Sequence, residues 1–194
     1  MGRPKEFDPE RALTRAMELF WERGYQATSM QDLVDHMGIN RGSLYDTFGG
    51  KRALFQAALE RYCALFVSAL VTSLQGPGSA QAEISSALQG EIEALLDPAR
   101  PHGCLLTSSA IELSSRDEQV RATVGESLLR VEDAFCELLT REAHPGDRRD
   151  LARALLALLQ GMIVLARSGR DRSALEGVAR AALLLIEPPP PPGP

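Results

Sequence analysis

The sequence has few of the features that mark membrane or exported proteins. No uninterrupted apolar run reaches the ~18 residues that a membrane-spanning helix needs, and the beginning of the chain shows no apolar signal segment. We therefore expect a cytoplasmic protein.

Cysteine and histidine are scarce as well. The three cysteines, Cys63, Cys104 and Cys136, are widely spaced, and the three histidines form no HxxH or HExxH motif. The odd cysteine count and the spacing argue against a disulfide framework and a zinc motif. A metal site assembled from distant residues is the remaining alternative, and we expect no metal and no cofactor.

Net positive charge, which would favour DNA binding, is also missing. The 194 residues carry 21 Lys and Arg against 26 Asp and Glu, a net charge of -5. Residues 1–62 hold nine basic and nine acidic side chains, and the rest of the chain holds twelve and seventeen. Because phosphate binding needs only a local basic face, this charge does not exclude a DNA-binding N-terminal segment.

The sequence does contain a nearly continuous helical pattern. Hydrophobic residues make up 44% of the chain and recur at spacings of three and four, whereas strand-like alternation is absent. Gly and Pro separate most of the helical segments. An all-α fold of about nine helices is predicted, at residues 9–23, 28–37, 41–48, 51–74, 79–96, 103–114, 117–143, 147–168 and 172–186.

Local signals mark the ends of the first three helices. Asp8 precedes a proline and an acid, which is typical of a helix start, and Gly24 suits the left-handed residue that ends a helix. Thr28 and Gln31 have the spacing of a capping box and predict the second start. Asn40 can cap the third helix.

Three segments follow from these boundaries. We expect a small N-terminal helical domain at residues 1–50 and a longer helical domain at residues 51–187. Residues 188–194 are a proline-rich tail that cannot pack as a helix.

The second and third predicted helices have the properties of a helix-turn-helix. Gly38 permits a tight turn, and Ile39 can fill the gap between the two helices. The third helix begins with the small and polar residues Arg41-Gly42-Ser43, which can enter a major groove, while Leu44 and Phe48 point back to the core. An ordinary helical hairpin in a bundle is the alternative interpretation of the same pattern.

The residues in this region also resemble a known family. Their motifs are Gly24-Tyr25-x-x-Thr28 and Leu44-Tyr45-x-x-Phe48-x-x-Lys51-Arg52-x-Leu54, after an arm Gly2-Arg3-Pro4-Lys5. Over roughly residues 3–60 the chain resembles the tetracycline-repressor (TetR) family of transcriptional regulators. The segment His102-Gly103-Cys104-Leu105-Leu106 is similar, more weakly, to family members that sense electrophiles or oxidants.

The resemblance implies a set of DNA contacts. Thr28, Gln31 and Lys51 would face phosphates, residues 41–43 would lie at base edges, and Tyr45 would contact the backbone. Asp46 departs from the family pattern, because an acid repels phosphate unless it accepts from cytosine N4. The expected contacts are Arg3, Lys5, Thr28, Gln31, Arg41, Gly42, Ser43, Tyr45, Thr47 (where the family often has His) and Lys51.

An effector pocket is expected among the middle helices. Cys104 lies near a predicted helix start after His102, where a thiolate can be stabilised, so it is a candidate sensor thiol; the alternative is a small buried hydrophobe. The expected lining is Phe66, Leu70, Leu88, Ile92, Cys104, Thr107, Ser108, Ile111 and Phe135. A solid core is the alternative for these residues.

A symmetric dimer is expected from the last two helices, since their apolar stripes exceed what one thin domain would bury. The expected interface residues are Leu151, Leu155, Leu158, Met162, Leu165, Leu175, Val178, Ala182 and Leu185. Two recognition helices in a dimer imply a near-palindromic operator.

Together these patterns favour a ligand- or redox-responsive transcriptional repressor that binds operator DNA. Residues 1–50 would be its DNA-binding helix-turn-helix domain, and residues 51–187 its helical effector-binding and dimerisation domain. A helical redox or interaction protein, in which the helix pair is only scaffold, is the second hypothesis. An enzyme is the weakest hypothesis, because no GxSxG elbow surrounds Ser108, Ser109 or Glu112.

Overall fold

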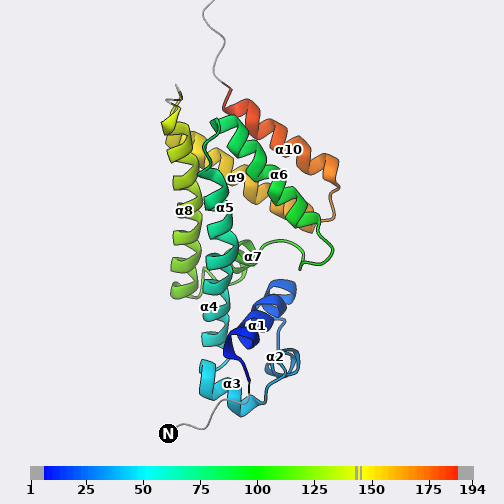
Figure 1. Ribbon diagram of the computed structural model, residues 1–194. Coiled ribbons are helices and arrows are strands. Elements are labelled where there is room, and N and C mark those ends of the chain that lie inside the picture. The colour runs from blue at the N-terminus through cyan, green and yellow to red at the C-terminus, as the bar shows by residue number, and fades with distance from the viewer. Residues whose placement is uncertain (1–6, 143, 145, 188–194) are drawn as a thin grey trace, which may run out of the picture. The chain divides into compact units, whose positions relative to one another are not determined.

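The computed structural model describes residues 7–142, 144 and 146–187. The predicted contacts of Arg3 and Lys5 and the proline-rich tail lie outside the described residues. The described part contains helices and no strand, which confirms the all-α prediction (Figure 1). The elements are α1 (Pro9–Arg23), α2 (Met30–Met37), α3 (Arg41–Phe48), α4 (Lys51–Tyr62), the π-helical turn η1 (Cys63–Val67), α5 (Ser68–Leu74), α6 (Ala80–Leu96), α7 (Leu105–Glu112), α8 (Glu118–Arg141), α9 (Arg148–Arg167) and α10 (Arg172–Leu185).

The chain forms two compact units. The first comprises the described residues up to Leu65 together with Cys104–Gly125, and the second comprises Phe66–Gly103 together with the described residues from Glu126 onward. These units do not coincide with the boundary expected at residue 50. The difference arises because α4 and α7 pack against α1 in the first unit, a long-range association that no local break in the sequence signals.

The caps of the first unit explain where its helices begin and end. The Asp8 carboxylate accepts hydrogen bonds from the backbone N–H groups of Glu10 (3.0 Å) and Arg11 (3.4 Å) at the start of α1. The Asn40 amide oxygen accepts from the Ser43 N–H (2.8 Å) at the start of α3. Both caps were expected from the sequence.

The start of α2 differs from the expectation. Ser29, not Thr28, is the N-cap, and it forms a reciprocal capping box with Asp32. The Ser29 hydroxyl accepts from the Asp32 N–H (3.0 Å), and the Asp32 carboxylate accepts from the Ser29 N–H (2.8 Å). The hydroxyl of the preceding residue, Thr28, is buried and donates instead to the Gly24 carbonyl, so it is not available to cap α2.

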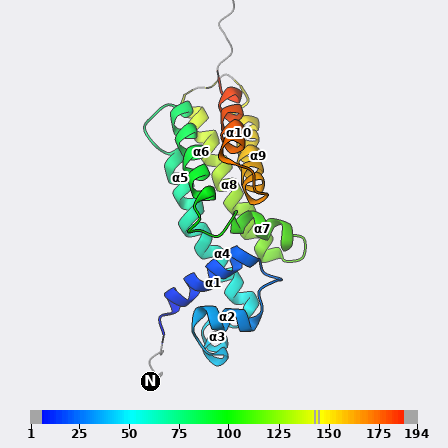
Figure 2. The ribbon, with the colours of Figure 1, turned by 90° about the vertical axis from the view of Figure 1, so that its right-hand side faces the viewer.

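Aromatic side chains form the core of the first unit. The Phe20 and Phe55 rings meet edge to face with centroids 5.0 Å apart, and Trp21 meets Tyr62 in the same way at 4.9 Å. Phe20 and Phe55 are fully buried. This packing fixes α1 across α4, a pair that also lies together in Figure 2.

The fourth predicted helix, residues 51–74, is interrupted in the structure. The π-helical turn Cys63–Val67 divides it into α4 and α5. A π-turn adds one residue to a helical turn without breaking the helix, and the segment Cys63–Val67 contains no Gly or Pro. The apolar pattern of the sequence therefore does not predict the π-helical turn.

In the second unit, α6, α9 and α10 pack against one another, and α5 packs against α6 (Figure 2). Asp147 caps α9 and Asp171 caps α10. The Arg172 guanidinium and the Glu93 carboxylate form a two-contact ion pair (2.5 and 2.8 Å) between α10 and α6. These hydrogen bonds lower the pKa of Glu93 and raise that of Arg172.

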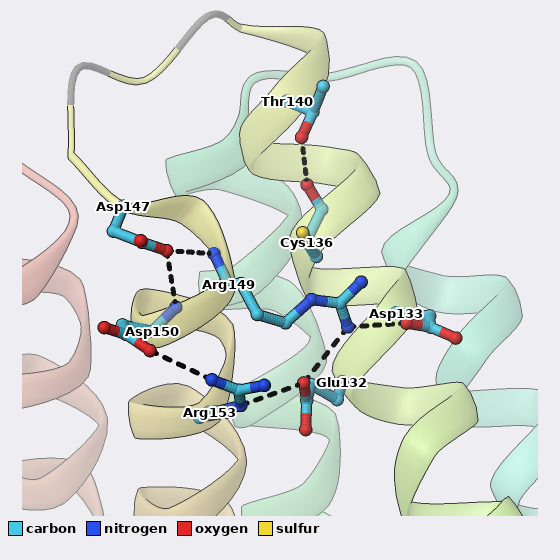
Figure 3. Close-up of polar contacts among 8 residues, drawn as sticks. All are labelled: Glu132, Asp133, Cys136, Thr140, Asp147, Arg149, Asp150 and Arg153. Carbon is cyan, nitrogen blue, oxygen red and sulfur yellow. Dashed lines mark hydrogen bonds and ion pairs between the residues drawn. The ribbon is translucent and has the colours of Figure 1, made fainter.

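A group of ion pairs joins α8 to α9 (Figure 3). Arg149 contacts Glu132 (3.0 Å) and Asp133 (2.6 Å), and Arg153 contacts Glu132 (3.3 Å). The bonds to Asp133 and Glu132 raise the pKa of Arg149. Cys136 is half-buried and lines a surface pocket of about 340 Å³ beside this group.

One helical stretch meets the length and composition criteria for a membrane span. Among the described residues, this is Lys51–Leu74, with 44% of its apolar window buried. A core helix of a soluble protein meets the same criteria, so the observation is weak evidence for a membrane.

Candidate DNA-binding interface and effector region

Helix α3 is short, anchored on one side and exposed on the other. Leu44 is fully buried, whereas Arg41, Gly42 and Asp46 are exposed and Tyr45 is 48% exposed. Ser43 and Thr47 are half-buried. The face predicted to read DNA is therefore open, and its N-terminal turn carries the flexible cation of Arg41.

Thr28 is a correction to the predicted contacts. Its side chain is fully buried, and its hydroxyl donates a hydrogen bond to the Gly24 carbonyl (2.6 Å). It supports the turn before α2 and does not present its hydroxyl to a phosphate. Gln31 is exposed and donates to Asp35 (2.8 Å) on the surface of α2.

Lys51 is the first residue of α4, and its ammonium lies 4.3 Å from the centroid of the Tyr25 ring. Burial lowers the pKa of Lys51, and the carboxylates of Glu112 and Asp32 oppose that shift. Gly50 precedes it and supplies no side-chain cap. The first turn of α4 thus combines backbone N–H groups that no side chain caps with the Lys51 ammonium beside Tyr25. Such an arrangement can bind a phosphate.

Glu112 is a residue whose role sequence analysis missed. At the end of α7, its carboxylate accepts hydrogen bonds from the backbone N–H groups of Tyr25 (3.0 Å) and Gln26 (2.6 Å). These partners lie more than eighty residues away in sequence. No local pattern could have identified the contact.

Arg52, part of the family motif, is engaged within the first unit. Its guanidinium donates to the Asp117 carboxylate (2.5 Å) and more weakly to Gln119 (3.4 Å). The hydrogen bond from Arg52 lowers the pKa of Asp117. Arg52 therefore joins α4 to the segment that begins α8.

Cys104 is the N-cap residue of α7 and is half-buried. The Tyr62 hydroxyl donates a hydrogen bond to its sulfur at 3.2 Å. Two other expected pocket residues in this unit, Thr107 and Ser108, are half-buried. Ile111 is 78% exposed, which corrects its assignment to the lining of an enclosed pocket.

The remaining expected pocket residues belong to the second unit. Leu88, Ile92 and Phe135 are buried, while Phe66 and Leu70 are half-buried. The Arg100 guanidinium lies 4.8 Å from the Phe66 ring centroid. Burial raises the pKa of nearby Glu91, and the charge of Arg100 opposes that shift. Sequence analysis named neither charged residue.

The expected dimer residues divide into two sets. The first set is buried within the protomer and is corrected to core: Leu155, Met162, Leu175 and Ala182. The second set is open to solvent to different degrees: Leu151, Leu158, Leu165 and Val178 are half-buried, and Leu185 is 46% exposed. Val164 (51%) and Leu184 (64%) are exposed on the same two helices and were not named from the sequence.

The described residues contain no group of three or more His, Cys, Asp or Glu side chains that could hold a metal ion. The three cysteines are free thiols. The candidate functional features of the described residues are therefore the exposed face of α3, the Lys51 ammonium that lies over the Tyr25 ring, and the half-buried Cys104 thiol.

These elements define a helix-turn-helix protein, and comparisons with known proteins give its family. Residues 12–58 match the family model of bacterial regulatory proteins of the tetR family, and residues 80–181 match that of the C-terminal domain of LmrA/YxaF-like transcriptional regulators. The chain belongs to the TetR family of bacterial transcriptional regulators.

Relatives support this along most of the chain. The HTH-type regulator YezE of Bacillus subtilis is 42% identical over 147 residues, 76% of either chain. The HTH-type transcriptional repressor ComR of Escherichia coli is 31% identical, covering 95% of this chain and 91% of ComR. A DNA-binding transcriptional regulator is the class to which all these relatives point.

Solved structures agree with the fold. A cysteine mutant of the TetR-family regulator CifR, bound to 26-bp double-stranded operator DNA, has a TM-score of 0.87 at 30% identity and covers 96% of this chain and 100% of its own. Reduced NemR of E. coli has a TM-score of 0.82 at 25% identity, covering 94% of this chain and 98% of its own.

Proposed function

We propose that this regulator is a repressor that binds near-palindromic operator DNA as a homodimer and releases it in response to a small ligand or a thiol-reactive compound. The observation that carries the DNA-binding part is α3: Leu44 is fully buried while Arg41 and Tyr45 remain exposed on the same helix. This division holds the helix firmly and leaves its reading face free. ComR, a named repressor, is among the relatives.

The proposed DNA contacts are those of the open face and its flanks. Arg41 would donate to a guanine edge, and Ser43 and Tyr45 would contact bases or backbone. Lys51 and Gln31 would hold phosphates, with Lys51 assisted by the free N–H groups at the start of α4. Thr28 drops out of this set because its hydroxyl is buried.

A homodimer is supported by the solvent-facing side of α9 and α10. Val164, Leu184 and Leu185 expose apolar surface there, and such surface favours burial against a partner. A second copy is the proposed partner because closed two-fold dimers are the commonest soluble oligomers. Two copies would place two α3 helices on one operator.

The response to an effector is proposed to involve Cys104. Cys104 is half-buried, and its sulfur accepts a hydrogen bond from the Tyr62 hydroxyl, so modification there adds bulk beside Tyr62 at the start of α7. With a maleimide, sulfur forms a bond to one alkene carbon and a proton from solvent adds to the other, so no oxidant is needed. For a reversible ligand, the proposed contacts in the first unit are the half-buried Thr107 and Ser108 of α7.

The function is proposed to be regulatory and cytoplasmic, without catalysis. The test uses duplex DNA from the region upstream of the chain's own gene in a gel-shift assay. We expect sequence-specific, salt-sensitive binding by the reduced protein and release by N-ethylmaleimide. Absence of specific binding under both reducing and oxidising conditions would favour the helical redox or interaction protein.

A further inference from the structure

The first unit contains a relay of contacts from α7 to the start of α4. The Glu112 carboxylate accepts from the N–H groups of Tyr25 (3.0 Å) and Gln26 (2.6 Å), and thereby holds the turn between α1 and α2. The Tyr25 ring in turn lies under the Lys51 ammonium, 4.3 Å from centroid to nitrogen. Each step is a direct contact between described residues.

The Glu112 carboxylate approaches the turn between α1 and α2 closely at Gly24. Gly24 has φ +82°, and a Cβ added there would lie 2.9 Å from Glu112 Oε2. A larger residue at position 24 would therefore be strained by the positive φ and would require the Glu112 carboxylate to shift. The Tyr25 ring is also held by Phe55, whose centroid is 5.0 Å away, so moving the Tyr25 backbone would move a packed ring.

Helix α7 is eight residues long and connects Cys104 at its start to Glu112 at its end. Leu105 and Leu106 are buried, and the buried Ser109 hydroxyl donates to the Leu105 carbonyl (2.7 Å). Cys104 occupies the N-cap position without a side-chain capping hydrogen bond, and Glu112 is the last residue of the helix. A rigid-body shift of this eight-residue helix would move Cys104 and Glu112 together.

We infer that Glu112 is a positioning residue for DNA binding: through Tyr25 it sets Lys51 for a phosphate, and a shift of α7 weakens that contact. The inference rests on the proposed role of Lys51 at the DNA backbone. It adds a route by which an event at α7 reaches the DNA-binding surface without any change in α3 itself.

Removing the charge of Glu112 has opposite expected effects on DNA affinity if the residue acts by charge alone and if it acts through Tyr25. Glu112 is an acid in a unit that binds a polyanion, so removing its charge should tighten DNA binding if it acts only through the electrostatic field. The relay instead predicts weaker binding, because a loosened Tyr25 no longer holds Lys51. Glu118 is the matched control, since its side chain is 91% exposed and forms an i,i+3 ion pair with Arg121 (3.5 Å) on the surface of α8.

The experiment measures affinity for a fluorescein-labelled random duplex by anisotropy from ~50 to ~200 mM salt. Random duplex suffices because phosphate contacts do not depend on sequence. The variants are Glu112→Gln, Lys51→Met, their double variant, and Glu118→Gln. Far-UV circular dichroism checks that each variant is folded.

We expect Lys51→Met and Glu112→Gln each to lower affinity and to reduce the steepness of log K against log salt by ~0.9, the value for one phosphate. The double variant should bind within about twofold of Lys51→Met, since both changes remove the same contact. Lys51→Arg should retain most of the binding, because it keeps a cation over Tyr25. Glu118→Gln should bind as the wild type or slightly more tightly.

Tighter binding by Glu112→Gln, an unchanged salt slope, or additive losses in the double variant would each overturn the inference. If Glu112→Gln does not fold, Tyr25→Leu takes its place: the relay predicts the same loss of slope, and an unchanged slope contradicts it. Failure of operator recognition or of maleimide release would instead count against the proposed function, because neither is measured on random duplex.

Discussion

The Tyr62 hydroxyl donates a hydrogen bond to the Cys104 sulfur at 3.2 Å, in the first unit of the chain. This contact places the thiol against a packed aromatic side chain, since Tyr62 also meets the Trp21 ring edge to face. A group added to the sulfur competes with this hydrogen bond at the start of α7, so we expect it to shift that end of the helix.

The first prediction follows from that contact. Treatment with N-ethylmaleimide should weaken the operator affinity of the wild type by about tenfold or more, equivalent to ~1.4 kcal/mol. Cys104→Ser should be insensitive to the reagent, and anisotropy titrations before and after treatment measure the difference. Cys136→Ser is the matched control, because Cys136 is also half-buried and accessible. Equal release of wild type and Cys104→Ser would assign the response to another thiol or a reversible ligand.

The second prediction concerns the dimer. Leu184→Glu places a charge on a side chain that is 64% exposed in the protomer, so it should cost little folding stability yet disrupt an apolar interface. Light scattering should give a dimer mass for the wild type and a monomer mass for the variant. Leu129→Glu, on α8 and 51% exposed, should remain dimeric. A wild type that is already monomeric at micromolar concentration would end the homodimer proposal.

The third prediction tests the corrected start of α2. Ser29→Ala removes a capping hydroxyl and should lower the free energy of unfolding by ~1 kcal/mol in urea titrations. Ser115→Ala is the control, at an exposed serine outside the described helices. If Ser29→Ala is as stable as the control, the capping box contributes nothing to folding.

The same cap predicts a pH dependence. Hydrogen bonds from the Ser29 side chain and backbone lower the pKa of Asp32 below 3.8. A carboxyl with a depressed folded-state pKa contributes stability above its unfolded pKa and loses it as the pH falls through the folded value. Between about pH 4 and pH 2, Ser29→Ala should therefore lose less stability than the wild type. Parallel unfolding curves over that range would contradict this assignment.

The sequence predicted the helices well and the tertiary contacts poorly. Asp8 and Asn40 are local caps, and their side chains bind backbone groups within three residues, as their spacing indicated. Glu112 was considered only as part of a possible hydrolytic site, because its partners Tyr25 and Gln26 are remote in sequence. Contacts of this kind depend on how helices pack, and one sequence does not encode them in a local pattern.

The spacing of apolar residues did not separate core positions from interface positions. It placed Leu155 and Leu185 on one predicted dimer surface, yet the structure buries Leu155 in the protomer and leaves Leu185 46% exposed. Both internal packing and association use apolar residues at helical spacing. The pattern alone cannot divide one wide stripe between the two.

The central claim is that α3 reads DNA sequence through its exposed N-terminal turn. The most direct measurement compares wild type and Arg41→Ala on operator duplex, on operators with single guanine changes, and on scrambled duplex. The account predicts that Arg41→Ala loses ~1–3 kcal/mol on the operator and becomes insensitive to one base position. Arg121→Ala, an exposed arginine on α8, should behave as the wild type. Wild-type affinity and specificity in a folded Arg41→Ala variant would contradict the account.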